Sequence, residues 1–289
     1  MKTALVFGGT RFFGVNLVKA LLSKGVTVTV ATRQNSEVPF DKNVDTLKVD
    51  RLDFESVNEA VRGRTWDMVF DQICYNARDA KIAVQALHGK TRKYIFTSTM
   101  SVYDFAENVS EADFNPYTYP ISDTPPDQVT YQEGKRQAEA VLFQMADFPV
   151  IAVRIPIVLG EQDYTERLLL HINRTKDGSV IGFPNLLAKM GFIHQEEAGH
   201  FLAWISEQDF SGPINACSNE IISMAELMAL IECEVGRKPS LPSTFDPSEH
   251  SPYGVENTWN MSNVKARELG YRFSTLNDWL PGLIKHLAN

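Results

Sequence analysis

The sequence predicts an α/β protein with a doubly wound parallel sheet and a smaller, partly interleaved C-terminal domain. Three observations support this prediction. The chain begins with an apolar strand, Thr3–Phe7, that leads into a glycine-containing turn and then into a helix. Strand and helix patterns then alternate up to about residue 160, as they do in a parallel sheet covered by helices on both faces. After residue 160 the pattern becomes irregular and is interrupted by Gly and Pro.

The turn after the first strand has the composition of a diphosphate site. It runs from Gly8 to Gly14 (GGTRFFG), and its glycines allow a sharp turn and the close approach of a ligand. The helix that follows ends before Gly25 and has one apolar face, formed by Val15, Val18, Leu21 and Leu22. The N–H groups and the positive dipole end of such a helix point at the turn, so this unit is suited to bind a diphosphate.

The remaining elements follow in order. Further strands are expected at residues 26–31, 46–49, 67–70, 94–97, 150–153 and 213–217. Further helices are expected at residues 55–61, 77–87, 131–145, 166–172, 196–205 and 276–287. Another helix should begin after Ser223, which forms a capping box with Glu226. Residues 108–128 and 239–252 contain several prolines each and are predicted to be loops.

This order predicts the division of the chain. Residues 1–160 should form a Rossmann domain that binds NAD(P), with residues 192–218 returning to it. Residues 161–191 and 219–289 should form a small substrate-binding domain.

Composition excludes several classes of protein. The chain has 289 residues, of which 44% are hydrophobic and 22% charged, as is ordinary for a globular protein. The net charge of −8 argues against broad binding to nucleic acid or to membrane surfaces. The three cysteines show no paired or metal-like spacing, so we expect no metal site. No signal-peptide pattern or membrane-length apolar segment occurs, and we expect a cytoplasmic protein.

Tyr131 and Lys135 form the strongest catalytic pattern. Residues four apart lie on one face of a helix, so the lysine ammonium can stabilise the tyrosine phenolate. The tyrosine can then act as an acid or base nearer neutral pH. A solvated helix face would give the same spacing, but a hydroxyl-rich segment, Thr97-Ser98-Thr99, ends the preceding strand.

These motifs together resemble those of the extended or atypical short-chain dehydrogenase/reductases, the NAD-dependent epimerase/dehydratase family. The segment 97–103 (TSTMSVY) resembles the family's Ser-Ser-x-x-Val-Tyr-Gly, and Gly8 and Gly14 match its glycine motif, with Arg11 in place of the middle glycine. The resemblance implies that Thr99 is the catalytic hydroxyl, with Ser98 as the alternative if the register shifts by one. Further similar segments occur in the expected order, at Ala138-Glu139 and at residues 154–160, 192–198 and 264–270.

The cofactor is predicted from the end of the second strand. NAD-dependent members carry an acid there, whereas this chain has Arg33, which can meet a 2′-phosphate, and Arg11 can add a second cation. We therefore expect NADP to be preferred over NAD. Asp50 should accept from the adenine amino group, although Asp50 and Asp53 also suit a helix N-terminus. The resemblance implies this cofactor-binding set: Gly8, Thr10, Arg11, Phe12, Phe13, Gly14, Arg33, Asp50, Arg51, Tyr131 and Lys135.

The resemblance implies an NAD(P)-dependent oxidoreductase or epimerase that acts on a hydroxyl or carbonyl carbon of a sugar-like or other small molecule. Met100-Ser101 disfavours a 4,6-dehydratase, which has Asp-Glu there, and Ile157 replaces the Asn of nucleotide-sugar epimerases. Such proteins commonly form homodimers through two Rossmann helices.

The turn sequence leaves a second class of function open. The GGTRFFG turn is typical of an atypical subgroup that includes the chloroplast stem-loop RNA-binding proteins. A non-catalytic nucleotide- or RNA-binding protein, or a regulatory protein that binds NADP and a partner chain, therefore remains an alternative. These relatives tend to lose the tyrosine that this chain retains at Tyr131.

Overall fold

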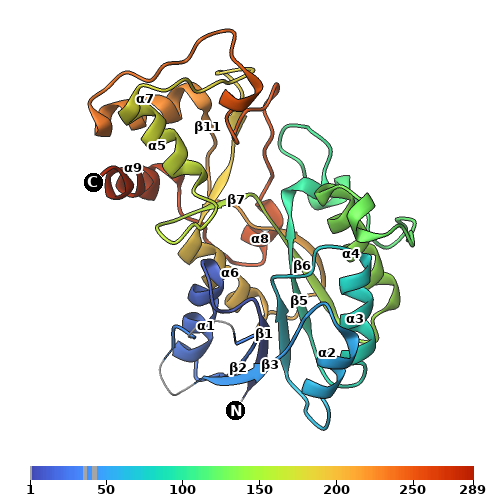
Figure 1. The fold of residues 1–289 in the computed structure, drawn as a ribbon. Coiled ribbons are helices and arrows are strands. Elements are labelled where there is room, and N and C mark those ends of the chain that lie inside the picture. Colours follow the sequence, from blue (N-terminus) through green and yellow to red (C-terminus); the bar gives the residue numbers. More distant parts are fainter. Residues whose placement is uncertain (1, 35–37, 41–43) are drawn as a thin grey trace. The chain divides into compact units, whose positions relative to one another are not determined.

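The computed structural model describes residues 2–34, 38–40 and 44–289. They divide into two compact units. The first unit holds a seven-stranded parallel sheet of order β10-β6-β5-β4-β1-β2-β3 (Figure 1), which confirms the predicted doubly wound α/β fold. Its strands are β1 (Thr3–Phe7), β2 (Thr27–Thr32), β3 (Asp45–Lys48), β4 (Met68–Asp71), β5 (Tyr94–Thr99), β6 (Val150–Ile155) and β10 (Gly212–Asn215).

Helices cover both faces of this sheet. Alternate residues of a strand point to opposite faces, so Leu5 and Phe7 lie in the core beneath the helices on one face. Those helices are α2 (Phe54–Ala60), α3 (Ala77–Leu87) and α4 (Tyr131–Met145). On the other face lies α1 (Phe13–Ser23), and α6 (Gln195–Ile205) approaches it so closely that a Cβ on Gly199 would lie 2.6 Å from the Leu17 nitrogen.

The second unit comprises Asp104–Ser110, Pro156–Glu197 and Cys217–Asn289. It contains two small pairings, the parallel pair β7 (Ile157–Leu159) and β9 (Phe192–His194) and the antiparallel pair β8 (Lys189–Met190) and β11 (Ile222–Ser223). Its own hydrophobic core lies among three helices, α5 (Arg167–Asp177), α7 (Met224–Val235) and α9 (Leu276–Ala288). A short helix, α8 (Val264–Glu268), precedes α9.

The element predictions hold where local pattern determines structure. The bounds of α3 and α4 agree with the sequence, and the capping box of Ser223 and Glu226 is present at α7. The strands β7, β8, β9 and β11 were not predicted, because strands of two or three residues form only through pairing with distant segments. The segment that returns to the first unit is Ala198–Ala216, shorter than the expected 192–218, because Phe192–His194 pairs with β7 instead. No helix in the described ranges is both long and apolar enough to cross a membrane.

Candidate active site

The sheet order reverses between β1 and β4, and this reversal locates the candidate site. From β1 the chain adds β2 and β3 on one side, and it then returns to β4 and continues to β5, β6 and β10 on the other. In open α/β sheets, ligands bind outside the carboxyl ends of the strands at such a point. The glycine turn directly follows β1, so it lies at this edge of the sheet.

The glycine turn is built for close backbone packing. Gly8 has a φ of 80°, which favours glycine, and a Cβ on Gly14 would lie 2.2 Å from the Gly8 carbonyl oxygen. No side chain caps the N-terminus of α1, and no acidic residue lies in its first turn. The first turn of α1 therefore supplies no anion of its own to this positive end, which fits a diphosphate held by backbone N–H groups.

Phe12 holds a strained backbone conformation in the same turn. Its φ of 51° and ψ of −137° are unusual for a residue with a bulky side chain. The ring is buried and packs edge-on against Phe13, with centroids 5.4 Å apart. Strain of this kind costs about 1–3 kcal/mol and persists where surrounding packing enforces it, often at ligand sites. Arg11, the preceding residue, is exposed.

Helix α4 places Tyr131 and Lys135 in different environments. Thr130 caps the helix by accepting from the Glu133 N–H, so Tyr131 is the first helical residue, and its side chain is 55% exposed. Lys135, one turn further along, is buried. The exposed tyrosine can meet a substrate, whereas the lysine is enclosed by the protein.

Two carbonyl groups fix the Lys135 ammonium. Its Nζ donates to the Cys74 oxygen at 2.8 Å and to the Thr97 oxygen at 2.9 Å. The rings of Tyr75 and Phe96 lie 4.9 and 4.7 Å from Nζ. Burial lowers the Lys135 pKa to about 8, against opposing contributions from Cys74 and nearby carboxylates. The charge therefore sits at the carboxyl ends of β4 and β5 and is conditional on pH.

The two candidate hydroxyls at the end of β5 have different partners. The Ser98 hydroxyl donates to Glu139 and is buried in a polar network. The Thr99 oxygen accepts from the Ser101 N–H at 3.1 Å, and its hydroxyl donates to the Ser101 hydroxyl at 3.3 Å, so its partners belong to the same local turn and not to a distant charged group. Because Ser98 is engaged by Glu139, Thr99 is the better candidate for a substrate contact.

A buried ion pair explains two of the sequence motifs. Arg154 from β6 donates to Glu139 from α4 through Nη2 at 2.6 Å and Nε at 3.0 Å, and both side chains are 0% exposed. Arg154 also donates to the Tyr103 hydroxyl at 2.8 Å, which donates to Asn215 of β10 at 2.6 Å. Together with the contact of Ser98 from β5, the network joins α4 to three strands and so holds the helix that carries Tyr131. In the sequence, Glu139 and Arg154 were noted only as parts of segments that resemble the family, and no role was predicted for either residue.

The residues predicted to bind the adenosine part of the cofactor have different surroundings in the structure. Arg33 is exposed at the end of β2, as a contact to a 2′-phosphate requires. Asp50 is exposed, and its Oδ1 accepts from the Leu52 N–H at 3.1 Å. Arg51 is buried and pairs with Asp71 through Nη2 at 2.6 Å. Arg51 therefore has a structural partner that the sequence did not reveal, and its contact with the cofactor stays a prediction.

Gln72 is a candidate site residue that the sequence reasoning missed. It follows β4 directly, and its Nε2 is buried without a hydrogen-bond partner among the described residues. A Cβ on Gly14 would lie 3.0 Å from its Oε1, so this amide borders the glycine turn. The available signal was its position at the carboxyl end of the strand next to β1.

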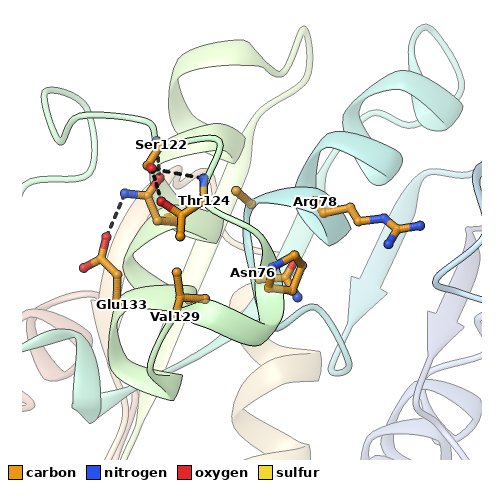
Figure 2. A pocket seen from close by; sticks show the side chains of 10 residues that line it. Asn76, Arg78, Ser122, Thr124, Val129 and Glu133 are labelled. Atoms are coloured by element: carbon orange, nitrogen blue, oxygen red, sulfur yellow. Dashed lines mark hydrogen bonds between the residues drawn. The ribbon is translucent and has the colours of Figure 1, made fainter.

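A small cavity lies beside α4 (Figure 2). Its volume is about 50 Å³, and residues from the starts of α3 and α4 and from the segment 122–129 line it. Glu133 accepts from Gln137, which accepts in turn from the Ser122 N–H. A cavity of this size holds about one water molecule, and none of Thr99, Tyr131 and Lys135 is among its lining residues.

Comparison with known proteins decides the family. A family profile described as NAD(P)H-binding matches residues 8–181, more than half of the chain. The chain belongs to this NAD(P)H-binding family. The match begins at Gly8 and includes the glycine turn, Thr99, Tyr131 and Lys135.

Two curated relatives have different functions. The chain is 26% identical over 235 residues to the chloroplast stem-loop binding protein of 41 kDa b of Arabidopsis thaliana, covering 76% of this chain and 59% of that protein. It is 28% identical over 216 residues to the 2′-dehydrokanamycin reductase of Streptomyces kanamyceticus, covering 71% of this chain and 58% of that protein. The matched region thus spans less than two thirds of the length of either relative.

The solved structures agree on the fold. The UDP-glucuronic acid 4-epimerase of Bacillus cereus, solved with UDP-glucuronic acid and NAD, superposes with a TM-score of 0.77 at 18% identity, covering 99% of this chain and 98% of that one. The fold is therefore the NAD(P)-binding fold found in epimerases and reductases, as the resemblance predicted. The assignment to the GGTRFFG subgroup stays a prediction.

Proposed function

We propose that this protein is an NADP-dependent oxidoreductase or epimerase that acts on a hydroxyl or carbonyl carbon of a sugar-like or other small molecule. One observation carries the proposal: the Lys135 ammonium is fixed one helical turn from the exposed Tyr131, at the strand edge that also bears Thr99. The similarity to a protein named as a reductase favours reduction of a carbonyl group.

Each residue then has a distinct task. Tyr131 donates a proton to the substrate oxygen in reduction and accepts it in oxidation. Thr99 donates a hydrogen bond to the same oxygen and orients it toward Tyr131. The Lys135 charge stabilises the Tyr131 phenolate, and its remaining N–H donor can hold a ribose hydroxyl. When bound, the nicotinamide ring supplies or accepts the hydride.

The preference for NADP follows from charge at the end of β2. Arg33 is exposed there, and the sequence 31–34 (ATRQ) has no acid to bind the ribose 2′-hydroxyl of NAD. A guanidinium can bind a 2′-phosphate through two hydrogen bonds. Titration calorimetry should give tighter binding of NADPH than of NADH, and Arg33→Ala should weaken NADPH more than NADH. Equal affinity for the two cofactors in the unmodified protein would contradict the preference.

The catalytic assignment is tested with Tyr131→Phe. Carbonyl compounds are first screened for NADPH oxidation by the unmodified protein. The variant should lose roughly 10²–10⁴-fold in turnover, the usual contribution of a general acid, while its affinity for NADPH is nearly unchanged. Tyr117→Phe is the control, since Tyr117 is similarly exposed in the same unit but lies outside α4. Unchanged turnover in Tyr131→Phe would refute the assignment.

A second function, RNA binding without chemistry, is favoured by one observation, the similarity to the chloroplast stem-loop binding protein. Filter binding of a stem-loop RNA across a salt series separates the two functions. Specific binding with a steep salt dependence, together with no binding of NADPH, would favour this second function. The net charge of −8 opposes it.

A further inference from the structure

Two adjoining cavities lie entirely within the second unit. The first has a volume of about 330 Å³ and the second about 530 Å³, and they share Asn219 and Arg267 in their linings. Both volumes fall within the roughly 300–1,000 Å³ typical of small-molecule sites. The lining of the first cavity comes from Asn108, from the segment 217–221 after β10 and from the segment 260–267, which includes most of α8.

Two asparagines present unpaired amide atoms to the first cavity, although each side chain is more than nine-tenths buried. The Asn260 Oδ1 accepts from the Asn108 N–H at 3.0 Å, which leaves its Nδ2 without a partner in the described chain. The Asn263 Nδ2 donates to the Cys217 oxygen at 2.9 Å and to the Asn219 Oδ1 at 3.1 Å, which leaves its own Oδ1 without a described partner.

These contacts fix the orientation of both amides, because a backbone N–H must meet an oxygen and a backbone carbonyl must meet a nitrogen. Neither the Asn260 Nδ2 nor the Asn263 Oδ1 is one of the fully enclosed polar atoms that lack a partner in the described chain. Both atoms therefore keep some accessible surface, through which a ligand can reach them. The cavity therefore offers one fixed donor and one fixed acceptor.

Arginine side chains accompany these amides. Arg267 lines both cavities and Arg272 lines the second, and both guanidinium groups are exposed and form no ion pair within the described ranges. Tyr271 also lines the second cavity, and its ring packs against that of Phe273 with centroids 4.6 Å apart. On a chain with a net charge of −8, two such cations at one pair of cavities form a local site for an anion.

A carboxylate completes the set of polar groups. Glu220 lines the first cavity, and its Oε2 accepts from Asn277 at 3.1 Å. A carboxylate has capacity for further donors, so it can also accept from a ligand hydroxyl. The lining thus combines hydroxyl-binding groups with anion-binding groups.

We propose that these cavities bind a small anionic molecule with several hydroxyl groups, of the sugar phosphate class. The hydroxyl groups occupy the first cavity, where Asn260 donates and Asn263 and Glu220 accept. The anionic group lies toward Arg267 and Arg272. The site uses none of Thr99, Tyr131 and Lys135, so it does not depend on the proposed function.

The experiment measures binding of glucose 6-phosphate by titration calorimetry, with NADPH at saturation so that the diphosphate site of the first unit is occupied. Glucose and inorganic phosphate are titrated in parallel. The first variant, Asn260→Asp, keeps the acceptor for the Asn108 N–H and replaces the free donor with a negative oxygen. The second, Arg267→Gln, changes an exposed side chain and should not disturb folding. The control, Lys238→Gln, removes an exposed charge of the same unit that lines neither cavity.

We expect glucose 6-phosphate to bind more tightly than glucose or phosphate. Arg267→Gln should weaken it by about tenfold or more, as the loss of one charge-assisted contact implies. Asn260→Asp should also weaken it, because it removes the donor and adds a negative charge near an anionic ligand, and Lys238→Gln should leave it unchanged. Equal binding of phosphate alone would overturn the hydroxyl part of the proposal, and equal binding of glucose would overturn the anionic part. The proposal also fails if none of the three probes binds. If glucose 6-phosphate does not bind but Arg267→Gln weakens the binding of a stem-loop RNA, Arg267 contacts RNA and the proposal is wrong. If the unmodified protein does not bind NADPH but the three variants affect glucose 6-phosphate binding as expected, the result would count against the proposed function only.

Discussion

Replacing Glu139 with glutamine should destabilise the first unit by about 3–5 kcal/mol, because it leaves Arg154 as a buried charge without its partner. The two side chains are 0% exposed, and Glu139 receives hydrogen bonds from two Arg154 nitrogens and from Ser98. Glutamine keeps one oxygen acceptor but turns an NH₂ group toward donors. The loss is large beside the 5–15 kcal/mol of stability typical of a domain.

A second ion pair with the same N–O distance provides a control for this prediction. Lys24 and Glu207 also lie 2.6 Å apart, but their side chains are 36% and 30% exposed. Glu207→Gln should therefore cost only about 0–1 kcal/mol, since solvent screens an exposed pair. Burial, and not distance, should determine the cost.

Urea unfolding followed by circular dichroism measures both variants, with NADPH binding as a separate readout for the first unit. The double variant Glu139→Met with Arg154→Met removes both charges and should recover much of the lost stability, because hydrophobic residues of similar size can replace a buried pair. The reasoning is refuted if Glu139→Gln costs no more than Glu207→Gln, or if the double variant is less stable than Glu139→Gln alone.

Three further predictions follow from the structure. Because Lys135 must be charged to stabilise the Tyr131 phenolate, kcat/KM for NADPH, which reports the free protein, should fall as pH rises through about 8, and Lys135→Arg should move this limb upward; a limb that stays in place would exclude Lys135 as its source. Burial lowers the His171 pKa from 6.5 to about 4, so between these pH values the unfolded state binds a proton that the folded state does not. The free energy of unfolding should therefore fall by about 3 kcal/mol as pH drops from 6.5 to 4. Urea titrations of His171→Phe should show no such loss. Gly14→Ala should abolish NADPH binding in calorimetry, since its Cβ would lie 2.2 Å from the Gly8 oxygen; Gly282→Ala, where nothing lies within 4 Å, should bind normally, and equal binding by both variants would count against the turn as the diphosphate site.

The sequence predicted the first unit well because its elements carry local signals. The inner strands β1, β4, β5 and β6 contain continuous apolar runs, and α3 and α4 have caps at Asn76 and Thr130 that define their starts. The second unit was predicted less completely. Its β7–β9 pair joins residues more than thirty positions apart, and a strand of three residues has no pattern of its own.

The candidate site shows the same limit. The spacing of Tyr131 and Lys135 was visible in the sequence, since a helix brings residues four apart onto one face. The partners of Lys135 were not visible, because they are backbone carbonyls of Cys74 and Thr97 on two other elements. The same applies to Arg51, whose pairing with Asp71 depends on the three-dimensional neighbourhood of β4.

The environment of Lys135 separates two tasks that the Tyr-x-x-x-Lys pattern combines. The contacts that hold the ammonium come from two carbonyls and two rings of the protein, and none of them involves Tyr131. Tyr131 is exposed and can meet a substrate, whereas the charged Lys135 is buried. Burial places the Lys135 pKa only about one unit above neutral pH, so a negative group bound nearby would raise it and secure the charge. The lysine should therefore titrate at higher pH in the NADPH complex than in the free protein, which a pH series of tyrosine and lysine reactivity with and without NADPH would detect; an unchanged Lys135 pKa would place the bound cofactor too far from the ammonium for this catalytic assignment.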